Sequence, residues 1–266
     1  MELVANARMY AVTAAAKAAW VELFAWVIGS SGVPLIYLDH AAPAPLEDLW
    51  TRDDLGAVFM CGFPFASATP QPIALAAPAP SPPRYGGRLR YCTDFIVRAD
   101  SRFTTLRDTF GGRIGWTVEH SQSGYNAVRH HLLGQQGPEP LYAEWVGPLV
   151  TPRRVIEAVL DGRIDVGPLD SYVHDLIRRH DPETASKLRV VESTVMTPIP
   201  LLVASPSVDG EAVARLRQAL LTCHSDPAMR ATLDALLISR FETVAAADYD
   251  VLSVWQEEAD RAARRL

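Results

Sequence analysis

The chain has 266 residues, enough for one large domain or two lobes. Apolar residues make up 48% and charged residues 21%, a composition that excludes disordered and fibrous classes. The net charge is −6 and no dense basic run occurs, so a nucleic-acid partner is not expected. The three cysteines, Cys61, Cys92 and Cys223, are too widely spaced for a disulfide framework or a zinc motif.

The first predicted elements are a strand over Leu3–Tyr10 and an amphipathic helix within residues 11–28. Lys17 and Glu22 interrupt the apolar run of that helix, so it is neither a membrane span nor a secretory signal segment. The sequence as printed shows no signal peptide. Two expectations follow: the protein is cytoplasmic, or a leader was removed and the protein is periplasmic.

A buried strand over Gly56–Met60 comes next and ends at the turn Cys61-Gly62-Phe63-Pro64. A second apolar run follows at Ile73–Ala77. Four prolines and two glycines then crowd residues 78–87, a density that predicts neither helix nor central strand. We expect this stretch to carry the chain out of a first lobe.

The middle of the chain alternates short apolar runs with helical patterns. The predicted strands are Arg90–Arg98, Arg113–Val118, Tyr142–Val146, Ile164–Gly167, Leu188–Val191 and Ile199–Ala204. Thr151-Pro152 and Asp209 each open a helix, and the chain after Asp209 is predicted to be helical to its end. Such alternation predicts an α/β fold with mainly parallel sheets flanked by helices, and ligands bind beyond the carboxyl ends of such strands.

Ser121-Gln122-Ser123-Gly124-Tyr125 is the most informative stretch for function. A polar turn between a strand and a helix exposes free backbone N–H groups, and Ser121 and Ser123 add two hydroxyls, so the turn suits an oxyanion. The alternative is that one serine is only the helix N-cap. The string matches neither a nucleotide-binding P-loop nor a nucleophile elbow.

Other candidate residues carry weaker signals. Gly62 allows a ligand to approach the backbone beside Cys61, which we interpret as an inert buried thiol. Asp170 follows a strand and either points toward a ligand or caps the next helix. His130-His131 and the pair His174 and His180 lack the spacing of metal ligands on one helix face, so no metal is predicted.

Several motifs together resemble the phosphate, phosphite and phosphonate substrate-binding proteins of ABC transporters. They are Met9-Tyr10, the W-x-x-D-D-L…C-G-F-P pattern over Trp50–Pro64, S-Q-S-G-Y-N-A at Ser121–Ala127, and the segment Val159–Ser171. The similarity runs from about Ala5 to Ser205. The strings at Cys61–Pro64 and Ser121–Ala127 are fairly specific in combination.

The resemblance implies a type II periplasmic-binding fold of two lobes. From the stretch Pro78–Gly87 and the strand Leu188–Val191, which would carry the chain back, we expect residues 1–90 and 194–266 in lobe one and residues 91–193 in lobe two. The resemblance also implies that a ligand lies in the cleft between the lobes. The implied contacts are Tyr10, Cys61, Gly62 and Phe63 from lobe one, and Ser121, Ser123, Gly124, Tyr125, Thr151 and Asp170 from lobe two. Thr151-Pro152 stands where the family often has Ser-His, a departure that bears on ligand choice.

The leading hypothesis is a protein that binds a small phosphonate- or phosphate-like anion for ABC transport or sensing, with no catalytic residue, cofactor or metal. An ABC-transporter permease is the expected protein partner, and no membrane insertion is expected. The alternative is a cytoplasmic enzyme on the same fold that acts on a small carboxylate, because fold alone does not determine function.

Overall fold

The computed structural model describes residues 2–135 and 140–263, which form two compact units. Unit one comprises Met1–Arg90 and Pro198–Tyr249, and unit two comprises Tyr91–Thr197 and Asp250–Leu266. The chain therefore passes between the units three times. The sequence placed residues 194–266 in the first lobe, whereas the structure groups the C-terminal segment with unit two, because its helix packs on helices of that unit.

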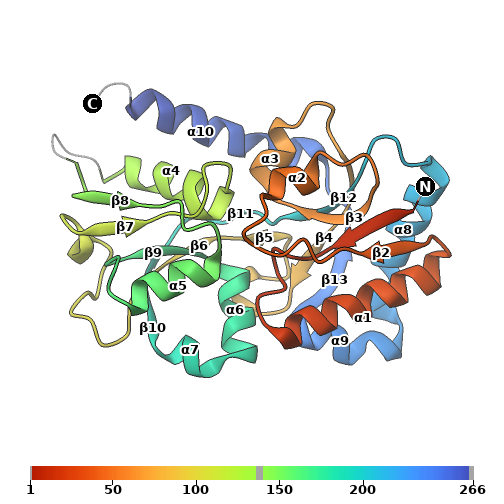
Figure 1. The fold of residues 1–266 in the computed structure, drawn as a ribbon, viewed down its shortest axis with the longest axis horizontal. Coiled ribbons are helices and arrows are strands. Elements are labelled where there is room, and N and C mark those ends of the chain that lie inside the picture. Colours follow the sequence, from red (N-terminus) through yellow and green to blue (C-terminus); the bar gives the residue numbers. More distant parts are fainter. Residues whose placement is uncertain (1, 136–139, 264–266) are drawn as a thin grey trace. The chain divides into compact units, whose positions relative to one another are not determined.

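Unit one is built on a six-stranded sheet with the order β13-β4-β12-β3-β1-β2 (Figure 1). The strands are β1 (Leu3–Asn6), β2 (Leu35–Tyr37), β3 (Leu55–Met60), β4 (Ile73–Pro80), β12 (Leu201–Ala204) and β13 (Ile238–Glu242). Strand β1 pairs parallel with β2 and β3, and the other three pairs are antiparallel. The predicted mainly parallel sheet is therefore wrong: β12 belongs to the segment that returns to unit one after residue 197 and runs against both of its neighbours.

The helices of unit one flank this sheet. They are α1 (Ala14–Ser31), α2 (Leu46–Trp50), α3 (Gly62–Ser67), α8 (Gly210–Thr222) and α9 (Arg230–Ala235), with short 3-10 turns at Pro83–Tyr85, Cys223–Ser225, Pro227–Met229 and Ala246–Tyr249. Helix α1 packs against both α8 and α9 (Figure 1). Its N-cap Thr13 accepts from the Ala16 N–H, and Gly32 ends it at φ +64°. Trp20 and Phe24 lie on its buried face, as the predicted amphipathic pattern requires.

Strand β4 corrects the expectation that prolines exclude a strand over residues 78–80. Its first half pairs with β12, and its second half, which holds Pro78 and Pro80, pairs with β13. Among the described residues, β12 pairs with β4 only as far as Ala76, before the first of these prolines. Proline has no N–H group to donate, and this is tolerated here because the β12 side of this half of the strand forms no ladder hydrogen bonds.

Strand β13 corrects a second expectation, because the sequence after Asp209 was predicted to be helical throughout. The segment Ile238–Glu242 buries Ile238 and Phe241, leaves the other three residues more exposed, and adds an edge strand beside β4. Leu237, at φ +54°, turns the chain from α9 into this strand. A bulky residue seldom adopts that left-handed backbone conformation, so the local sequence carries little signal for the turn.

Unit two has smaller sheets. Its strands are β6 (Thr93–Arg98), β7 (Arg113–Gly115), β8 (Glu144–Val146), β9 (Gly167–Asp170) and β10 (Leu188–Ser193). The order β10-β6-β9 is antiparallel, β7 and β8 are parallel, and an isolated bridge joins Ile114 to Val166. At the unit boundaries, the short strands β5 (Arg90–Tyr91) and β11 (Thr197–Pro198) pair with each other.

The helices of unit two enclose a core that includes Phe95, Val128 and Tyr142. They are the π-helical turn η3 (Gln122–Asn126), α4 (Ala127–Leu133), α5 (Pro152–Leu160), α6 (Ser171–His180), α7 (Pro182–Ser186) and α10 (Asp250–Ala263), with a 3-10 turn at Arg107–Thr109. Helix α10 packs along α4 and η3 (Figure 1). Among the described residues no helix is both long and apolar enough to cross a bilayer.

Candidate functional site

The predicted oxyanion turn of unit two begins a continuous helical segment. Ser121 is its N-cap, and the Ser121 hydroxyl accepts from the Gly124 N–H at 2.9 Å. The Asn126 N–H donates to the Ser121 carbonyl at 2.9 Å, which gives the first turn its π-helical width. Ser121 therefore has the capping role that the sequence left open, and Ser123 is not the cap.

Gly124 is required by close packing at this turn. A Cβ placed on Gly124 would lie 1.9 Å from Thr117 Oγ1 and 2.9 Å from Ser121 Oγ. The Gly124 carbonyl in turn accepts from the Thr117 N–H at 3.2 Å. Thr117, which follows β7, is the residue that holds the turn against the sheet, and sequence reasoning missed it because it lies outside the motif.

Ser123 and Tyr125 are candidate donors to a ligand. Their N–H groups lie in a first helical turn, where no preceding turn supplies acceptors. Ser123 and Tyr125 are both half-buried. The Tyr125 ring lies 5.2 Å from the Trp116 ring, measured between centroids, and its centroid lies 5.2 Å from the guanidinium of Arg129. The turn thus combines neutral donors with an aromatic side chain of fixed position.

Thr151 caps α5 as predicted, with its hydroxyl accepting from the Arg154 N–H at 3.2 Å. The preceding residue, Val150, has φ +67°, which is strained for a β-branched side chain. Two hydrogen bonds hold this conformation: Leu149 N–H donates to the Trp116 carbonyl at 2.9 Å, and Val150 N–H donates to the Thr117 carbonyl at 3.1 Å. Trp116 and Thr117 therefore contact both the loop before Thr151 and the Ser121–Tyr125 turn.

Asp170, at the end of β9, caps α6. Its Oδ1 accepts from the N–H groups of Tyr172 at 2.8 Å and Val173 at 3.0 Å, and only 7% of Asp170 is exposed. Burial, assisted by the Asp170 charge, raises the pKa of Tyr172, so this phenol stays neutral. The capping alternative for Asp170 is thus observed, and a ligand contact by Asp170 stays a prediction.

The predicted residues of unit one lie in its aromatic interior and at one helix start. Tyr10 is fully buried, with its ring 5.0 Å from Phe59 and 6.5 Å from Trp20. Cys61 is the N-cap of α3, which begins at Gly62, and its carbonyl accepts from the Phe65 N–H at 3.0 Å. These contacts explain why the C-G-F-P string folds as a strand-to-helix turn.

The cysteine thiols lie in the interior of the two units. All three cysteines are free and buried. Burial raises the pKa of Cys223 to about 12, which keeps this thiol protonated at neutral pH. Within residues 2–135 and 140–263, no cluster of three His, Cys, Asp or Glu side chains could hold a metal ion.

Unit two also buries an ionisable pair that sequence reasoning did not find. His174 Nδ1 lies 2.9 Å from Asp94 Oδ2, with exposed fractions of 1% and 0%, and the Ser193 hydroxyl donates to Asp94 Oδ1 at 2.8 Å. The partners come from α6, β6 and β10, so no local sequence spacing could reveal them. Full burial and mutual pairing are typical of a structural polar network.

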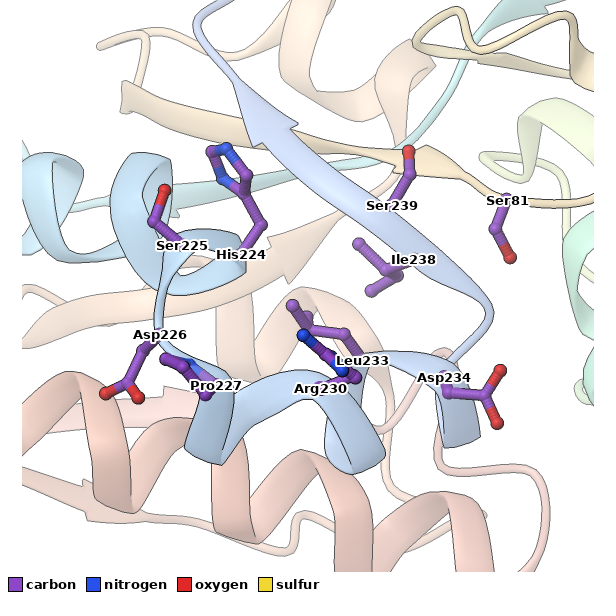
Figure 2. A pocket seen from close by; sticks show the side chains of 10 residues that line it. All are labelled: Ser81, His224, Ser225, Asp226, Pro227, Arg230, Leu233, Asp234, Ile238 and Ser239. Carbon is purple, nitrogen blue, oxygen red and sulfur yellow. The ribbon is translucent and has the colours of Figure 1, made fainter.

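A hollow of about 250 Å³ lies in unit one between β13, α9 and the turn that precedes α9 (Figure 2). His224 and Arg230 line it together with Asp226 and Asp234. Asp226 already accepts from the Trp26 indole N–H at 2.8 Å and the Ala228 N–H at 2.9 Å. None of the sequence-predicted site residues lines this hollow.

Several proteins of known structure are similar to this chain. A binding protein component of an ABC phosphonate transporter from Pseudomonas aeruginosa is 17% identical, with a TM-score of 0.79 over 98% of this chain and 89% of that one. PhnD1 from Prochlorococcus marinus, in complex with methylphosphonate, is 17% identical, with a TM-score of 0.79 over 100% and 98%. XAC2383 from Xanthomonas citri, bound to ATP, is 21% identical, with a TM-score of 0.64 over 97% of each chain. Among curated proteins, none matches the chain.

The two α/β units and these likenesses define the fold of a periplasmic binding protein of type II. A family model described as "ABC transporter, phosphonate, periplasmic substrate-binding protein" matches residues 12–249. The chain belongs to this family. The predicted α/β class and the predicted family are confirmed, and the enzyme alternative is not supported.

Proposed function

We propose that this protein binds a phosphonate- or phosphate-like oxyanion at the Ser121–Tyr125 turn of unit two. The single observation that carries the proposal is the geometry of the turn. The Gly124 N–H is occupied by Ser121 Oγ, and the N–H groups of Ser123 and Tyr125 and the Ser123 hydroxyl are the donors that we assign to a ligand. Hydrogen bonds to a charged group contribute about 1.5–3 kcal/mol each.

Neutral donors suit this role because the turn itself contains no Lys or Arg. Arg129, the nearest cation along the helical segment, is paired with Asp260 at 2.7 Å and lies over the Tyr125 ring. The helix dipole favours an anion at the same end of the segment. Binding without a dedicated cation avoids the cost of burying and desolvating one.

Family membership supports the biological setting of the proposal. We place the protein in the periplasm, where it delivers its ligand to the permease of an ABC transporter. Methylphosphonate is bound by the Prochlorococcus relative, and this makes it the first ligand to test here. Six further ligand contacts stay predictions: Tyr10, Cys61, Gly62, Phe63, Thr151 and Asp170.

The experiment is isothermal titration with methylphosphonate, phosphite, phosphate, sulfate and acetate, accompanied by thermal melting. A ligand at 100 times its Kd raises stability by about 2.7 kcal/mol. Ser123→Ala removes one hydroxyl donor and is expected to weaken oxyanion binding about 10- to 100-fold. Because Ser121 and not Ser123 caps the helical segment, the fold stability lost in Ser123→Ala is expected to stay below the cost of losing a cap, about 0.5–2 kcal/mol.

Ser239→Ala is the matched control, because the Ser239 hydroxyl donates to the Ala79 carbonyl in unit one, outside the proposed site. Oxyanion affinity is expected to be unchanged in this variant. If Ser123→Ala keeps wild-type affinity while its melting temperature falls, Ser123 serves only the fold and the assigned site is wrong. If the wild-type protein binds acetate and no phosphorus oxyanion, the ligand class is wrong.

A further inference from the structure

Thr93 is a buried side chain that holds a carbonyl group of the oxyanion turn. It begins β6, and 1% of it is exposed. Its hydroxyl donates to the Ser123 carbonyl at 2.8 Å. Thr93 lies 30 residues before Ser123 and outside every motif that the sequence analysis singled out.

The bond matters because a trans peptide unit is planar, with its C=O and N–H pointing in opposite directions. The unit that joins Ser123 to Gly124 is held at both ends by hydroxyls: its carbonyl by Thr93, and its N–H by Ser121 Oγ at 2.9 Å. The next unit is held at its carbonyl by the Thr117 N–H. The Tyr125 N–H must therefore point away from Thr117, and its direction depends on these three anchors.

Thr93 is itself rigidly placed by the segment that leads back toward unit one. Its N–H donates to Thr194 Oγ1 at 3.0 Å, and its carbonyl accepts from the Thr194 N–H at 2.9 Å. Thr194 is 7% exposed and lies three residues before β11. The turn, the start of β6 and the segment after β10 are thus joined through one residue.

We propose that Thr93 is a positioning residue of the oxyanion site. It never touches the ligand. By holding the Ser123 carbonyl, it fixes the peptide unit between Ser123 and Gly124, which lies between the Ser123 side chain and the Tyr125 N–H along the turn. Through Thr194 it links the orientation of this peptide unit to the segment between β10 and β11. This inference rests on the proposed function for its effect on affinity, and its effect on the turn is measurable without any ligand.

The test compares Thr93→Val, which keeps shape and removes the hydroxyl, with Thr93→Ser, which keeps the hydroxyl. Methylphosphonate affinity is expected to fall about 3- to 10-fold in Thr93→Val and to stay near wild type in Thr93→Ser. Amide hydrogen exchange at Gly124, whose N–H is bonded to Ser121 Oγ, is followed by NMR and is expected to be faster in Thr93→Val than in wild type or Thr93→Ser. Thr93→Ala serves as a second hydroxyl-free variant if the valine variant folds poorly.

Thr109→Val is the matched control. Thr109 is also 1% exposed in unit two, and its hydroxyl donates to the Leu106 carbonyl at 2.6 Å, with no bond to the turn. It is expected to lower the melting temperature without changing affinity or exchange at the turn. An affinity change below twofold in Thr93→Val, or equal changes in Thr93→Val and Thr109→Val, overturns the proposal.

The two hypotheses fail in different ways. If the wild-type protein binds no phosphorus oxyanion, the proposed function fails, and the exchange measurement still tests the positioning of the turn. If the wild-type protein binds methylphosphonate and Thr93→Val binds it equally, the role of Thr93 fails while the proposed function stands. Unchanged exchange at Gly124 in Thr93→Val refutes the role of Thr93 whatever the ligand.

Discussion

Gly124→Ala is the sharpest single perturbation of the oxyanion turn. The new methyl group would be placed 1.9 Å from Thr117 Oγ1, 2.8 Å from Thr117 Cγ2 and 2.9 Å from Ser121 Oγ. Real carbon atoms do not approach so closely, so the turn, Thr117 or both must shift. Thr117 is only 6% exposed, which leaves its short side chain little room to move.

The expected cost follows from this packing. Overfilling a packed interior destabilises a protein by about 1–3 kcal/mol, which lowers Tm by roughly 2–12 °C in a protein of this size. Gly134→Ala is the matched control at the other end of the same helical segment. Its Cβ would meet nothing within 4 Å, and Gly134 has φ −70°, so alanine there is expected to be neutral or stabilising by about 0.4–1 kcal/mol.

Denaturant unfolding and methylphosphonate titration of both variants are the assays. Thr117→Ala removes the two nearest obstructing atoms, so combining it with Gly124→Ala is expected to recover part of the stability lost in the single glycine variant. Equal stability of Gly124→Ala and Gly134→Ala would refute the packing argument. So would the absence of any rescue in the Gly124→Ala, Thr117→Ala double variant.

Three further predictions concern the surroundings of the site and the fold. Thr151→Ala removes the cap of α5 and is expected to cost about 0.5–2 kcal/mol in denaturant unfolding. Cys223, with a pKa raised by burial to about 12, should resist thiol reagents at pH 8 until the protein unfolds. Because the unfolded thiol loses its proton first, stability should fall as pH rises from about 9 toward 12, and Cys223→Ala should reduce that slope. Trp255→Ala removes a ring stacked on His130 at 4.2 Å and should cost about 3 kcal/mol, measured by the same unfolding assay.

Local patterns were sufficient for much of the fold. Helix α1 begins after its cap Thr13 and ends at Gly32, and α5 begins at Thr151-Pro152. Each of these boundaries depends on the chemistry of a few neighbouring residues. The predicted strand near Gly56–Met60 is present as Leu55–Met60. The combined C-G-F-P and S-Q-S-G-Y-N-A strings were enough to identify the family.

Other features were not readable because their causes lie far apart in the chain. Prolines 78 and 80 fit into β4 because that half of the strand needs hydrogen bonds toward β13 alone, and β13 begins more than 150 residues later. The C-terminal helix belongs to unit two through pairs such as Arg129 with Asp260. The direction of β12 likewise depends on its place between β3 and β4 after the chain returns to unit one. The spacing of apolar residues in the sequence does not encode that place.

For the site, the sequence by itself determined that a serine- and glycine-containing turn starts a helix, since free N–H groups and a cap follow from local chemistry. Only the tertiary structure decided how the serines divide their roles: Ser121 closes on the Gly124 N–H and leaves Ser123 open. It also decided which distant residues hold the turn, Thr93 at the Ser123 carbonyl and Thr117 against Gly124. The physical reason is that a hydrogen bond acts over about 3 Å of space, whatever the sequence separation of the residues it joins.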